Sequence, residues 1–302
     1  MKTIALGDFT IRRFVESGET MPVPSAAFGG LGGERLKALR RHMDPRCGDP
    51  HSDTLYFSMH SFVLEVGGRR ILIDTCNGND KHRTGVMTPM HMLKTDYLGN
   101  LARLGLKPED IDVVVCTHLH SDHVGWNTKL ENGAWVPTFP NARYLMSDLD
   151  VQFYGSLPSD HPQYELTRQS FDDSVLPVLA SGQAELVKGG YVVEHEIGRD
   201  VWLEGCAGHT PGTLAIHAES GGGHAIFSGD VFHHPVQIQD PTLNLGVDSD
   251  AETALAVRRR FIDTYANTDT ILLAAHFPTP TAGTVVKDGG ETIFRFRDAA
   301  GA

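Results

Sequence analysis

The sequence predicts an α/β protein whose functional residues follow the ends of strands. Short apolar runs rich in β-branched residues alternate with stretches of helical spacing along the 302 residues. Hydrophobic residues make up 40% of the chain, which is enough to bury a large core. Several of the predicted strands lead directly into residues of metal-ligating type, and α/β folds place their active sites at strand ends in this way.

The richest motif is the run Thr117–Trp126, which directly follows the strand-like run Ile111–Cys116. Its four potential metal ligands are His118, His120, Asp122 and His123. Residues i and i+2 of an extended segment point the same way, so the first two imidazoles are expected to converge on one point. The other two ligands lie past a turn and aim at a neighbouring point. Imidazoles and carboxylates are ligands that divalent ions prefer, and the spacing suits two adjacent ions better than one.

Three further segments end in the same manner. His209 lies in a turn punctuated by Gly and Pro after the strand-like Val201–Leu203, while Asp230 and His276 each end an apolar run. A histidine-rich surface loop is the simpler interpretation of the first motif, because 16 histidines make some clustering expected. Repetition of the strand-then-ligand pattern weighs against that interpretation.

The motifs H-x-H-x-D-H, G-H-T-P-G and S-G-D, followed by a histidine at the end of a late strand, resemble in type and order those of metallo-β-lactamase-fold hydrolases. The resemblance runs from about Leu55 to the C-terminus. It implies a four-layer αββα sandwich formed as a single domain over residues 1–302. Residues 1–54 are then an N-terminal extension that lies outside the resemblance.

The resemblance also implies a ligand set for two divalent metal ions per chain. One ion is expected on His118, His120 and His209, and the second on Asp122, His123 and His276, with Asp230 bridging the two. Zinc is the expected metal, with manganese, cobalt or iron as alternatives.

The implied reaction is hydrolysis by a metal-bound hydroxide, which Asp122 orients while it ligates. Among the branches of the family, the chain is most similar to the lactonases and organophosphate hydrolases, so a lactone or ester is the expected substrate. Many acyl-homoserine lactonases have Tyr three residues after the bridging Asp, where this chain has His233. We therefore predict that His233 hydrogen-bonds the substrate oxyanion or protonates the leaving alkoxide; a packing or surface role is the alternative.

Other functions stay open from the sequence. They are hydrolysis of phosphotriesters or β-lactams, persulfide dioxygenation at a single iron, and non-catalytic sensing of a small molecule. The bridging carboxylate of Asp230 disfavours a true β-lactamase, and the intact ligand set disfavours a sensor. One iron per chain would indicate the dioxygenase.

A formal net charge of −12 argues against a nucleic-acid substrate, which would need a cationic path. The basic groups Arg35–His42 and Arg258–Arg260 are interpreted as solvated helix faces. No run is apolar enough to span a membrane, and the four cysteines are scattered without a metal-knuckle or disulfide pattern. We expect a small-molecule substrate, no nucleic-acid or membrane partner, a homodimer as the oligomer to consider, and a cytoplasmic location.

The remaining segments carry local predictions. Leu55–Val66 and Arg69–Asp74 are expected to form a hairpin around a glycine turn, in which Asp74 supports the metal ligands without binding metal. Helices are predicted over Tyr97–Gly105 and Asp250–Phe261, the latter with an acidic start and a basic end. Cys206 is expected to be a small buried strand residue.

The segment Pro22–Gly33 is rich in Gly and Pro but also apolar. We predict that it covers the active-site mouth or a dimer partner, with Phe28 and Leu31 in an apolar substrate wall; a plain surface loop is the alternative. His60 is expected near the site. The other histidines, including His195, are assigned surface or packing roles.

Overall fold

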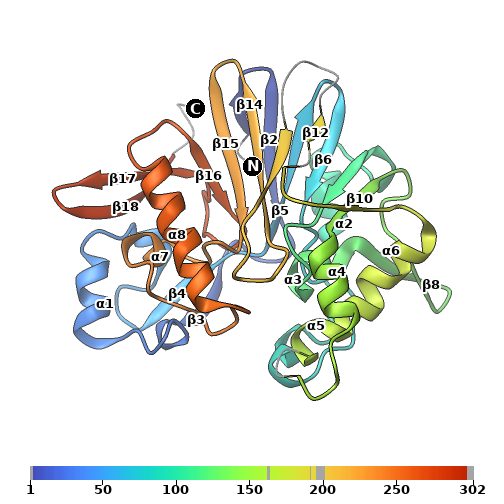
Figure 1. Cartoon of the computed structure of the whole chain (residues 1–302), viewed down its shortest axis with the longest axis horizontal. Helices are drawn as coiled ribbons and strands as arrows, with labels where there is room; N and C mark the ends of the chain where they lie inside the picture. The colour runs from blue at the N-terminus through green and yellow to red at the C-terminus, as the bar shows by residue number, and fades with distance from the viewer. Residues whose placement is uncertain (1–2, 162–163, 191, 195–200, 298–302) are drawn as a thin grey trace. The chain divides into compact units, whose positions relative to one another are not determined.

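Residues 3–161, 164–190, 192–194 and 201–297 are described by the computed structural model (Figure 1). The chain divides into two compact units. Unit 1 contains Thr3–Ser17 and His60–Lys188, and unit 2 contains Gly18–Met59 and Gly189–Ala302. Each unit has its own seven-stranded mixed sheet with helices packed on it, so the predicted α/β class is confirmed.

The sheet of unit 1 has the strand order β1-β2-β5-β6-β7-β10-β11. Its strands are β1 (Thr3–Leu6), β2 (Phe9–Val15), β5 (His60–Val66), β6 (Arg69–Ile73), β7 (Val113–Val115), β10 (Arg143–Ser147) and β11 (Ala184–Val187). The strands from β1 to β6 pair antiparallel, and those from β6 to β11 pair parallel. Because parallel strands end at the same edge of a sheet, the residues after β6 and β7 meet there.

Helices of unit 1 lie along its sheet (Figure 1). They are α2 (Tyr97–Ala102), α3 (Ser121–Val124), α4 (Asp148–Gly155), α5 (Tyr164–Ser170), the π-helical turn η6 (Phe171–Val175) and α6 (Leu176–Ser181). A hairpin of β8 (Thr128–Glu131) and β9 (Ala134–Pro137) and the 3-10 turns η3 (Gly85–Met90), η4 (Pro108–Asp110) and η5 (Gly125–Asn127) complete the unit. Tyr97 of α2 and Tyr154 of α4 pack with Val114 and Tyr144 of the sheet in one apolar core.

The sheet of unit 2 has the strand order β12-β13-β14-β15-β16-β17-β18. Its strands are β12 (Val192–Glu194), β13 (Val201–Gly205), β14 (Leu214–Ser220), β15 (Gly223–Gly229), β16 (Ile271–Ala274), β17 (Gly283–Asp288) and β18 (Glu291–Phe296). Only β15 and β16 pair parallel. The predicted strands before His209, Asp230 and His276 are therefore confirmed.

Unit 2 also contains α1 (Gly33–Arg40), α7 (Val236–Gln239), α8 (Ala251–Tyr265) and the 3-10 turns η1 (Ser25–Ala27) and η2 (Pro45–Cys47). Asp250 caps α8 by accepting hydrogen bonds from the backbone N–H groups of Glu252 and Thr253. The helix runs one turn beyond its predicted end, because Phe261 and Ile262 continue its buried face.

The segment Leu55–Phe57 is not part of the predicted hairpin. It belongs to β4 (Thr54–Phe57), which pairs with β3 (Met21–Pro24) in a separate two-stranded sheet of unit 2. The backbone N–H of Ser58 donates to the carbonyl of His276, so the strand breaks before β5 begins at His60. The rest of the hairpin, β5 with β6, is confirmed.

Residues of the N-terminal extension build a core instead of an open wall. Phe28 and Leu31 are buried, at 0% and 1% exposure, and pack with Leu36, Leu55 and Val236 in one apolar cluster of unit 2. A phenylalanine buried within a cluster stabilises the fold through lost water contact and dispersion. The prediction that these two side chains line a substrate wall is not supported by this placement.

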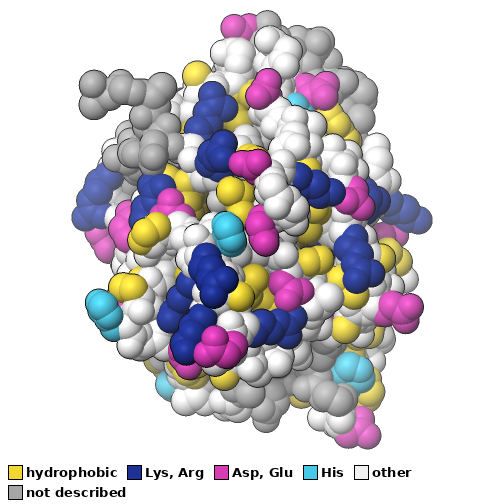
Figure 2. All heavy atoms as spheres, turned by 90° about the vertical axis from the view of Figure 1, so that its left-hand side faces the viewer, with side chains coloured by type: hydrophobic (Ala, Val, Ile, Leu, Met, Phe, Trp, Pro, Cys, Tyr) yellow, Lys and Arg dark blue, Asp and Glu magenta, His cyan; other side chains and the backbone are white. Residues whose placement is uncertain are grey.

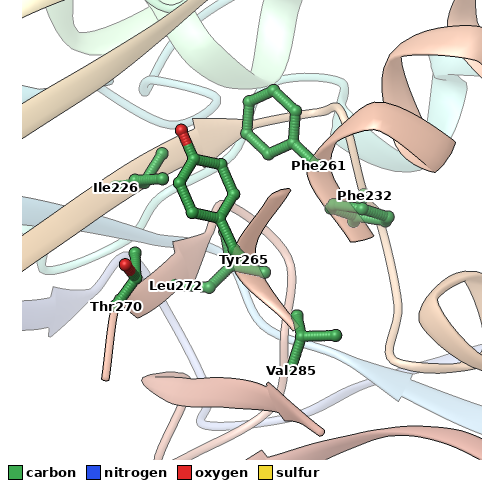
Figure 3. A pocket seen from close by; sticks show the side chains of 7 residues that line it. All are labelled: Ile226, Phe232, Phe261, Tyr265, Thr270, Leu272 and Val285. Carbon is green, nitrogen blue, oxygen red and sulfur yellow. The ribbon is translucent and has the colours of Figure 1, made fainter. Parts of the chain in front are cut away.

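A small cavity lies between α8 and the sheet of unit 2 (Figure 3). Phe261 and Tyr265 of the helix and Ile226, Leu272 and Val285 of the strands line it, and its volume is about 10 Å³. This space is close to the minimum that one water needs, and its walls are almost entirely apolar. It is a packing defect of the core and does not have the size of a substrate site.

Charged side chains of both signs are interspersed on the face shown in Figure 2. Several of the basic residues of unit 2 are ion-paired, including Arg35 with Asp240, Lys37 with Glu34, and Arg46 with Asp44. These pairs offset part of the positive charge of unit 2. Among the described residues, no helix has the length and apolar character needed to cross a bilayer.

Candidate metal centre

A first group of candidate ligands follows the parallel strands β6 and β7 of unit 1. Ile73 and Val115 are paired in register, so Asp74 and Thr117 emerge side by side. The Asp74 carboxylate accepts hydrogen bonds from the backbone N–H and the hydroxyl of Thr117, both at 2.8 Å. Its Oδ2 also lies 2.9 Å from Nδ1 of His123. A carboxylate can only accept, so the proton of a neutral His123 sits on Nδ1 and its Nε2 is left as the donor to a metal.

His118 and His120 converge as the extended spacing predicts. Nε2 of His118 lies 3.0 Å from Nδ1 of His120, and both side chains are buried. The opposite ring nitrogens point at supporting hydroxyls: Thr117 at 3.1 Å from His118, and Tyr154 at 3.3 Å from His120. The two inward nitrogens are therefore the pair available to one ion.

Asp122 and His123 lie on the short helix α3, where a turn was predicted. His120 occupies the N-cap position with extended φ and ψ, so the chain changes from strand-like to helical between the two ligand pairs. Oδ1 of Asp122 is 3.8 Å from Nε2 of His123, and the Asp122 side chain retains 21% exposure. Among the candidate ligands of unit 1, Asp122 is the one that solvent reaches most readily.

A second group of candidate ligands lies at one edge of the sheet in unit 2. Gly229 of β15 and Ala274 of β16 are paired in register in a parallel arrangement, which brings Asp230 and His276 together just beyond them. β13 runs in the same direction as β15, because both pair antiparallel with β14. The loop after β13 therefore delivers His209 to the same edge.

The two carboxylate oxygens of Asp230 face different imidazoles. Oδ2 lies 3.3 Å from Nε2 of His209, and Oδ1 lies 3.2 Å from Nε2 of His276. All three side chains are buried. The two oxygens of Asp230 thus contact imidazoles from two different loops of unit 2.

His209 is held by a second carboxylate. Its Nδ1 lies 2.9 Å from Oδ1 of Asp248, whose Oδ2 is bound by the guanidinium of Arg258 at 2.7 Å. Burial lowers the pKa of His209, but hydrogen bonds to Asp230 and Asp248 and the charges of both outweigh it and raise the pKa to about 9 in the metal-free protein. Burial also opposes ionisation of Asp248, yet His209 and Arg258 hold the pKa of that carboxyl well below its usual range.

His233 also faces this cluster. Its Nε2 is 3.2 Å from Oδ2 of Asp230 without hydrogen-bond geometry, and neither of its buried ring nitrogens has a hydrogen-bond partner among the described residues. The ligand atoms of His209, Asp230 and His233 all lie within 4.8 Å of one another, so these residues could hold a metal ion. The adjacent His234 points elsewhere and donates to the carbonyl of Cys47 at 2.8 Å.

Phe57 of β4, just after the N-terminal extension, packs against a candidate ligand. Its ring stacks on His276, with centroids 5.6 Å apart and planes at 18°, and also on His234 at 6.1 Å. Strand β4 therefore supports the position of His276 through packing.

The other predictions for single residues have mixed outcomes. Asp74 supports a ligand as predicted, and Cys206 is buried, directly after β13. The solvated assignment of Arg258–Arg260 is wrong for Arg258, which is 1% exposed because it shares the inward face of α8 with Ala254 and Phe261. His60 is buried at the start of β5 with its ring against Phe62, and none of the candidate ligand groups includes it.

Of the histidines assigned to surface or packing roles, His42, His51, His82 and His91 are exposed, and His161 and His224 are half-buried. His217 is buried and hydrogen-bonds His224 at 3.0 Å. His195 lies outside the described residues.

Three supporting residues were not anticipated: Tyr154, Asp248 and Arg258. None sits in a motif or directly after a strand that bears ligands, and Tyr154 is 34 positions from its partner His120. For Arg258 the sequence holds one signal, since it falls four residues after the buried Ala254 on α8.

Comparison with known proteins agrees with this description. Residues 57–276 match the Metallo-beta-lactamase superfamily. "Probable metallo-hydrolase Rv2300c" of Mycobacterium tuberculosis and "Probable metallo-hydrolase Mb2322c" of Mycobacterium bovis are each 23% identical over 200 residues, or 62% of this chain. The chain covers 61% of the length of these two relatives.

Solved structures share the fold over almost the whole chain. Hydrolase AbOPH of the β-lactamase superfamily has a TM-score of 0.79 at 23% identity and covers 98% of both chains. AidC, a dizinc quorum-quenching lactonase in complex with a product, has a TM-score of 0.77 at 17% identity, covering 99% of this chain and 98% of that one. Taken with the ordered motifs, the family match over residues 57–276 leads to one conclusion: the chain belongs to the metallo-β-lactamase superfamily.

Proposed function

We propose that this hydrolase uses two divalent metal ions, zinc in the first instance, to hydrolyse a lactone or ester of small size. His118, His120 and His209 hold one ion, Asp122, His123 and His276 hold the other, and Asp230 bridges them. The observation that carries the proposal is the pair of contacts from Asp230, whose Oδ2 faces His209 at 3.3 Å and whose Oδ1 faces His276 at 3.2 Å.

The donor set fits such ions. Buried neutral imidazoles and carboxylates suit zinc, and manganese, cobalt and iron accept the same ligands. The far ring nitrogens of His123 and His209 are tied to Asp74 and Asp248, which leaves Nε2 of each as the metal donor. The buried ring nitrogens of His233 have no hydrogen-bond partner among the described residues. Unpaired buried polar atoms reduce the stability of a fold unless a ligand or substrate satisfies them.

Bound divalent cations lower the pKa of coordinated water and polarise a carbonyl oxygen. Asp122 is the most exposed of the ligands in its unit, which suits it to accept a hydrogen bond from the attacking water and orient it. Burial lowers the pKa of His233, so its imidazole is neutral at pH 7 and still has one N–H to donate. We assign that N–H to the oxyanion of the substrate or to the leaving alkoxide.

The choice of a lactone or ester as substrate rests on the structural similarity to AidC and on His233. AidC is a lactonase described with N-hexanoyl-L-homoserine as its product, and its fold spans 99% of this chain. Many acyl-homoserine lactonases have a tyrosine where this chain has His233, so the position keeps a hydrogen-bond donor, but one of a different shape. A lactone or ester other than acyl-homoserine lactone is therefore the first class to assay.

The test is a substrate panel with metal analysis. Protein stripped with a chelator is reloaded with zinc, manganese, cobalt or iron and assayed on lactones, aryl esters, phosphotriesters and β-lactams. We expect two ions per chain and turnover of lactones or aryl esters. One iron per chain with oxygen consumption on persulfides would establish the dioxygenase instead, and metal binding without turnover on any class would favour a sensor.

Replacing the bridge tests the two-metal arrangement. Asp230→Ala removes the anion that separates two cations, so we predict loss of at least one ion and nearly all turnover. Asp263→Ala is the matched control, because that carboxylate is 72% exposed on α8 and forms an ion pair with Lys287. Full metal content and activity in Asp230→Ala would contradict the assignment.

A further inference from the structure

Asp248 stands between a candidate metal ligand and a buried arginine. Its Oδ1 lies 2.9 Å from Nδ1 of His209, and its Oδ2 accepts from the guanidinium of Arg258 at 2.7 Å. The side chains of Asp248, His209 and Arg258 are only 0%, 2% and 2% exposed. Neither Asp248 nor Arg258 is a metal ligand in the proposed function.

Arg258 connects the loops that carry two ligands. Its Nε donates to the carbonyl of Val231 at 2.9 Å, directly after Asp230. The segment after Asp248 holds the other loop, because Ser249 N–H donates to the carbonyl of His209 at 2.9 Å. The start of α8 and its buried arginine thus fix the spacing between His209 and Asp230.

We propose that Asp248 and Arg258 are positioning residues that set the tautomer of His209, which rests on the proposed function. A carboxylate only accepts hydrogen bonds and a guanidinium only donates them. Arg258 locks Asp248 in place, and Asp248 in turn requires the His209 proton on Nδ1. When a metal displaces the second proton of His209, the one on Nε2, the lone pair of Nε2 faces Asp230, where the metal is expected.

The most conservative substitution at this position, Asp248→Asn, should weaken zinc binding. In Asp248→Asn the amide oxygen must turn toward Arg258, because the guanidinium cannot accept. The amide NH₂ then faces Nδ1 of His209 and forces the proton onto Nε2, which can no longer bind metal. We expect zinc affinity, measured by competition with a chromophoric chelator, to fall by about 10- to 100-fold.

Changing the arginine in the same background should restore binding. The substitution Arg258→Gln supplies a side-chain oxygen that can accept from the NH₂ group introduced by Asp248→Asn. The amide at position 248 can then rotate and turn its own oxygen toward His209. Asp248→Asn with Arg258→Gln should therefore bind zinc more tightly than Asp248→Asn alone. The matched control is Asp248→Asn with Arg258→Lys, which keeps an obligate donor and should show no rescue.

Melting of each metal-free variant reports folding separately from zinc affinity. Additive losses in the double variants would overturn the proposal. If neither double variant folds, the single variants decide. Asp248→Ala removes the acceptor without imposing a donor, so it should retain more zinc affinity than Asp248→Asn, and the reverse order would overturn the idea. Wild-type protein that binds no metal would instead defeat the proposed function itself.

Discussion

His233 shows how burial alone defines a candidate functional group. Within the part of the chain that the structure describes, neither ring nitrogen of the buried His233 has a hydrogen-bond partner. Proteins seldom leave buried polar atoms unpaired unless a ligand satisfies them. Its position three residues after Asp230 puts the ring against His209 at 4.9 Å and parallel to His276 at 6.0 Å. The residue is therefore aimed at the same edge of the sheet as the ligands of unit 2.

We predict that His233→Ala reduces turnover by about a hundredfold or more, the usual cost of removing one oxyanion donor. The measurement is steady-state kinetics on the best substrate of the panel, with metals quantified in the same sample. Both ions should stay bound. His42→Ala, which removes an exposed imidazole, is the control. Loss of an ion from His233→Ala would show that the residue is a metal ligand, and wild-type turnover would assign it to packing.

At the scale of elements, the loop after β13 depends on one glycine. Gly208 has φ +139°, and a Cβ at this position would lie 2.4 Å from the backbone nitrogen of Ala254 in α8. Its carbonyl also accepts from Asp250 N–H at 2.9 Å. Only glycine allows the loop that carries His209 to approach the start of the helix so closely.

We predict that Gly208→Ala destabilises the protein by about 1–3 kcal/mol from backbone strain alone and weakens zinc binding by displacing His209. Gly205→Ala is the control, because a Cβ there meets nothing closer than 3.8 Å. Urea denaturation of metal-free protein and chelator competition give the two readouts. Equal behaviour of the two variants would mean that the loop shifts freely.

The apolar segment Pro22–Gly33 of the N-terminal extension is packed within unit 2. Phe28 is fully buried, with its ring edge-on to Phe57 at 5.9 Å, and Phe57 in turn stacks on His276. The extension is thus connected to a ligand by two aromatic contacts. This packing explains why a segment rich in Gly and Pro is also apolar.

Truncating Phe28 should therefore affect stability. We expect Phe28→Ala to lower the free energy of unfolding by about 3–5 kcal/mol, the range for buried phenylalanine. Leu130→Ala, at a side chain that is 45% exposed, should have little effect in the same denaturation assay. A higher Michaelis constant with unchanged stability would return this segment to the role of a substrate wall.

At the scale of the whole molecule, stability should fall in acid through a buried neutral histidine. His234 is 0% exposed, donates from Nε2 to Cys47, and accepts at Nδ1 from the N–H of Val236. Burial lowers its pKa from 6.5 to about 4. Between these values the unfolded chain takes up a proton that the folded chain does not, so stability is present above pH 6.5 and is lost as the pH falls toward 4.

The loss amounts to about 3 kcal/mol for this single group. Denaturation of metal-free protein at pH 7 and pH 4.5 measures it, and His234→Gln should flatten the difference between the two. His42→Gln, at an exposed site, should leave the difference as in wild type. An unchanged pH dependence in His234→Gln would show that other groups govern acid unfolding.

The candidate ligands could be proposed from the sequence because the signals that mark them are local in the chain. The extended spacing of His118 and His120 survives folding, and each later ligand follows a strand whose apolar composition marks it. Because β15 and β16 run parallel, both strands end at the same edge of the sheet, which brings Asp230 and His276 together. The family, the α/β class and the supporting role of Asp74 could be argued from those patterns alone.

The residues that support the candidate ligands could be identified only from the tertiary structure. Asp248 lies 39 positions from His209, and nothing between them marks the pairing. Arg258 looked like one of three solvated arginines until the packing of α8 turned it inward, and Leu55 left its expected hairpin because β3 offered it a different partner. Local spacing specifies which side chains share a turn or a strand. Contacts between distant segments depend on how whole elements pack, because burial and hydrogen bonding across the fold select among partners that the sequence leaves equivalent.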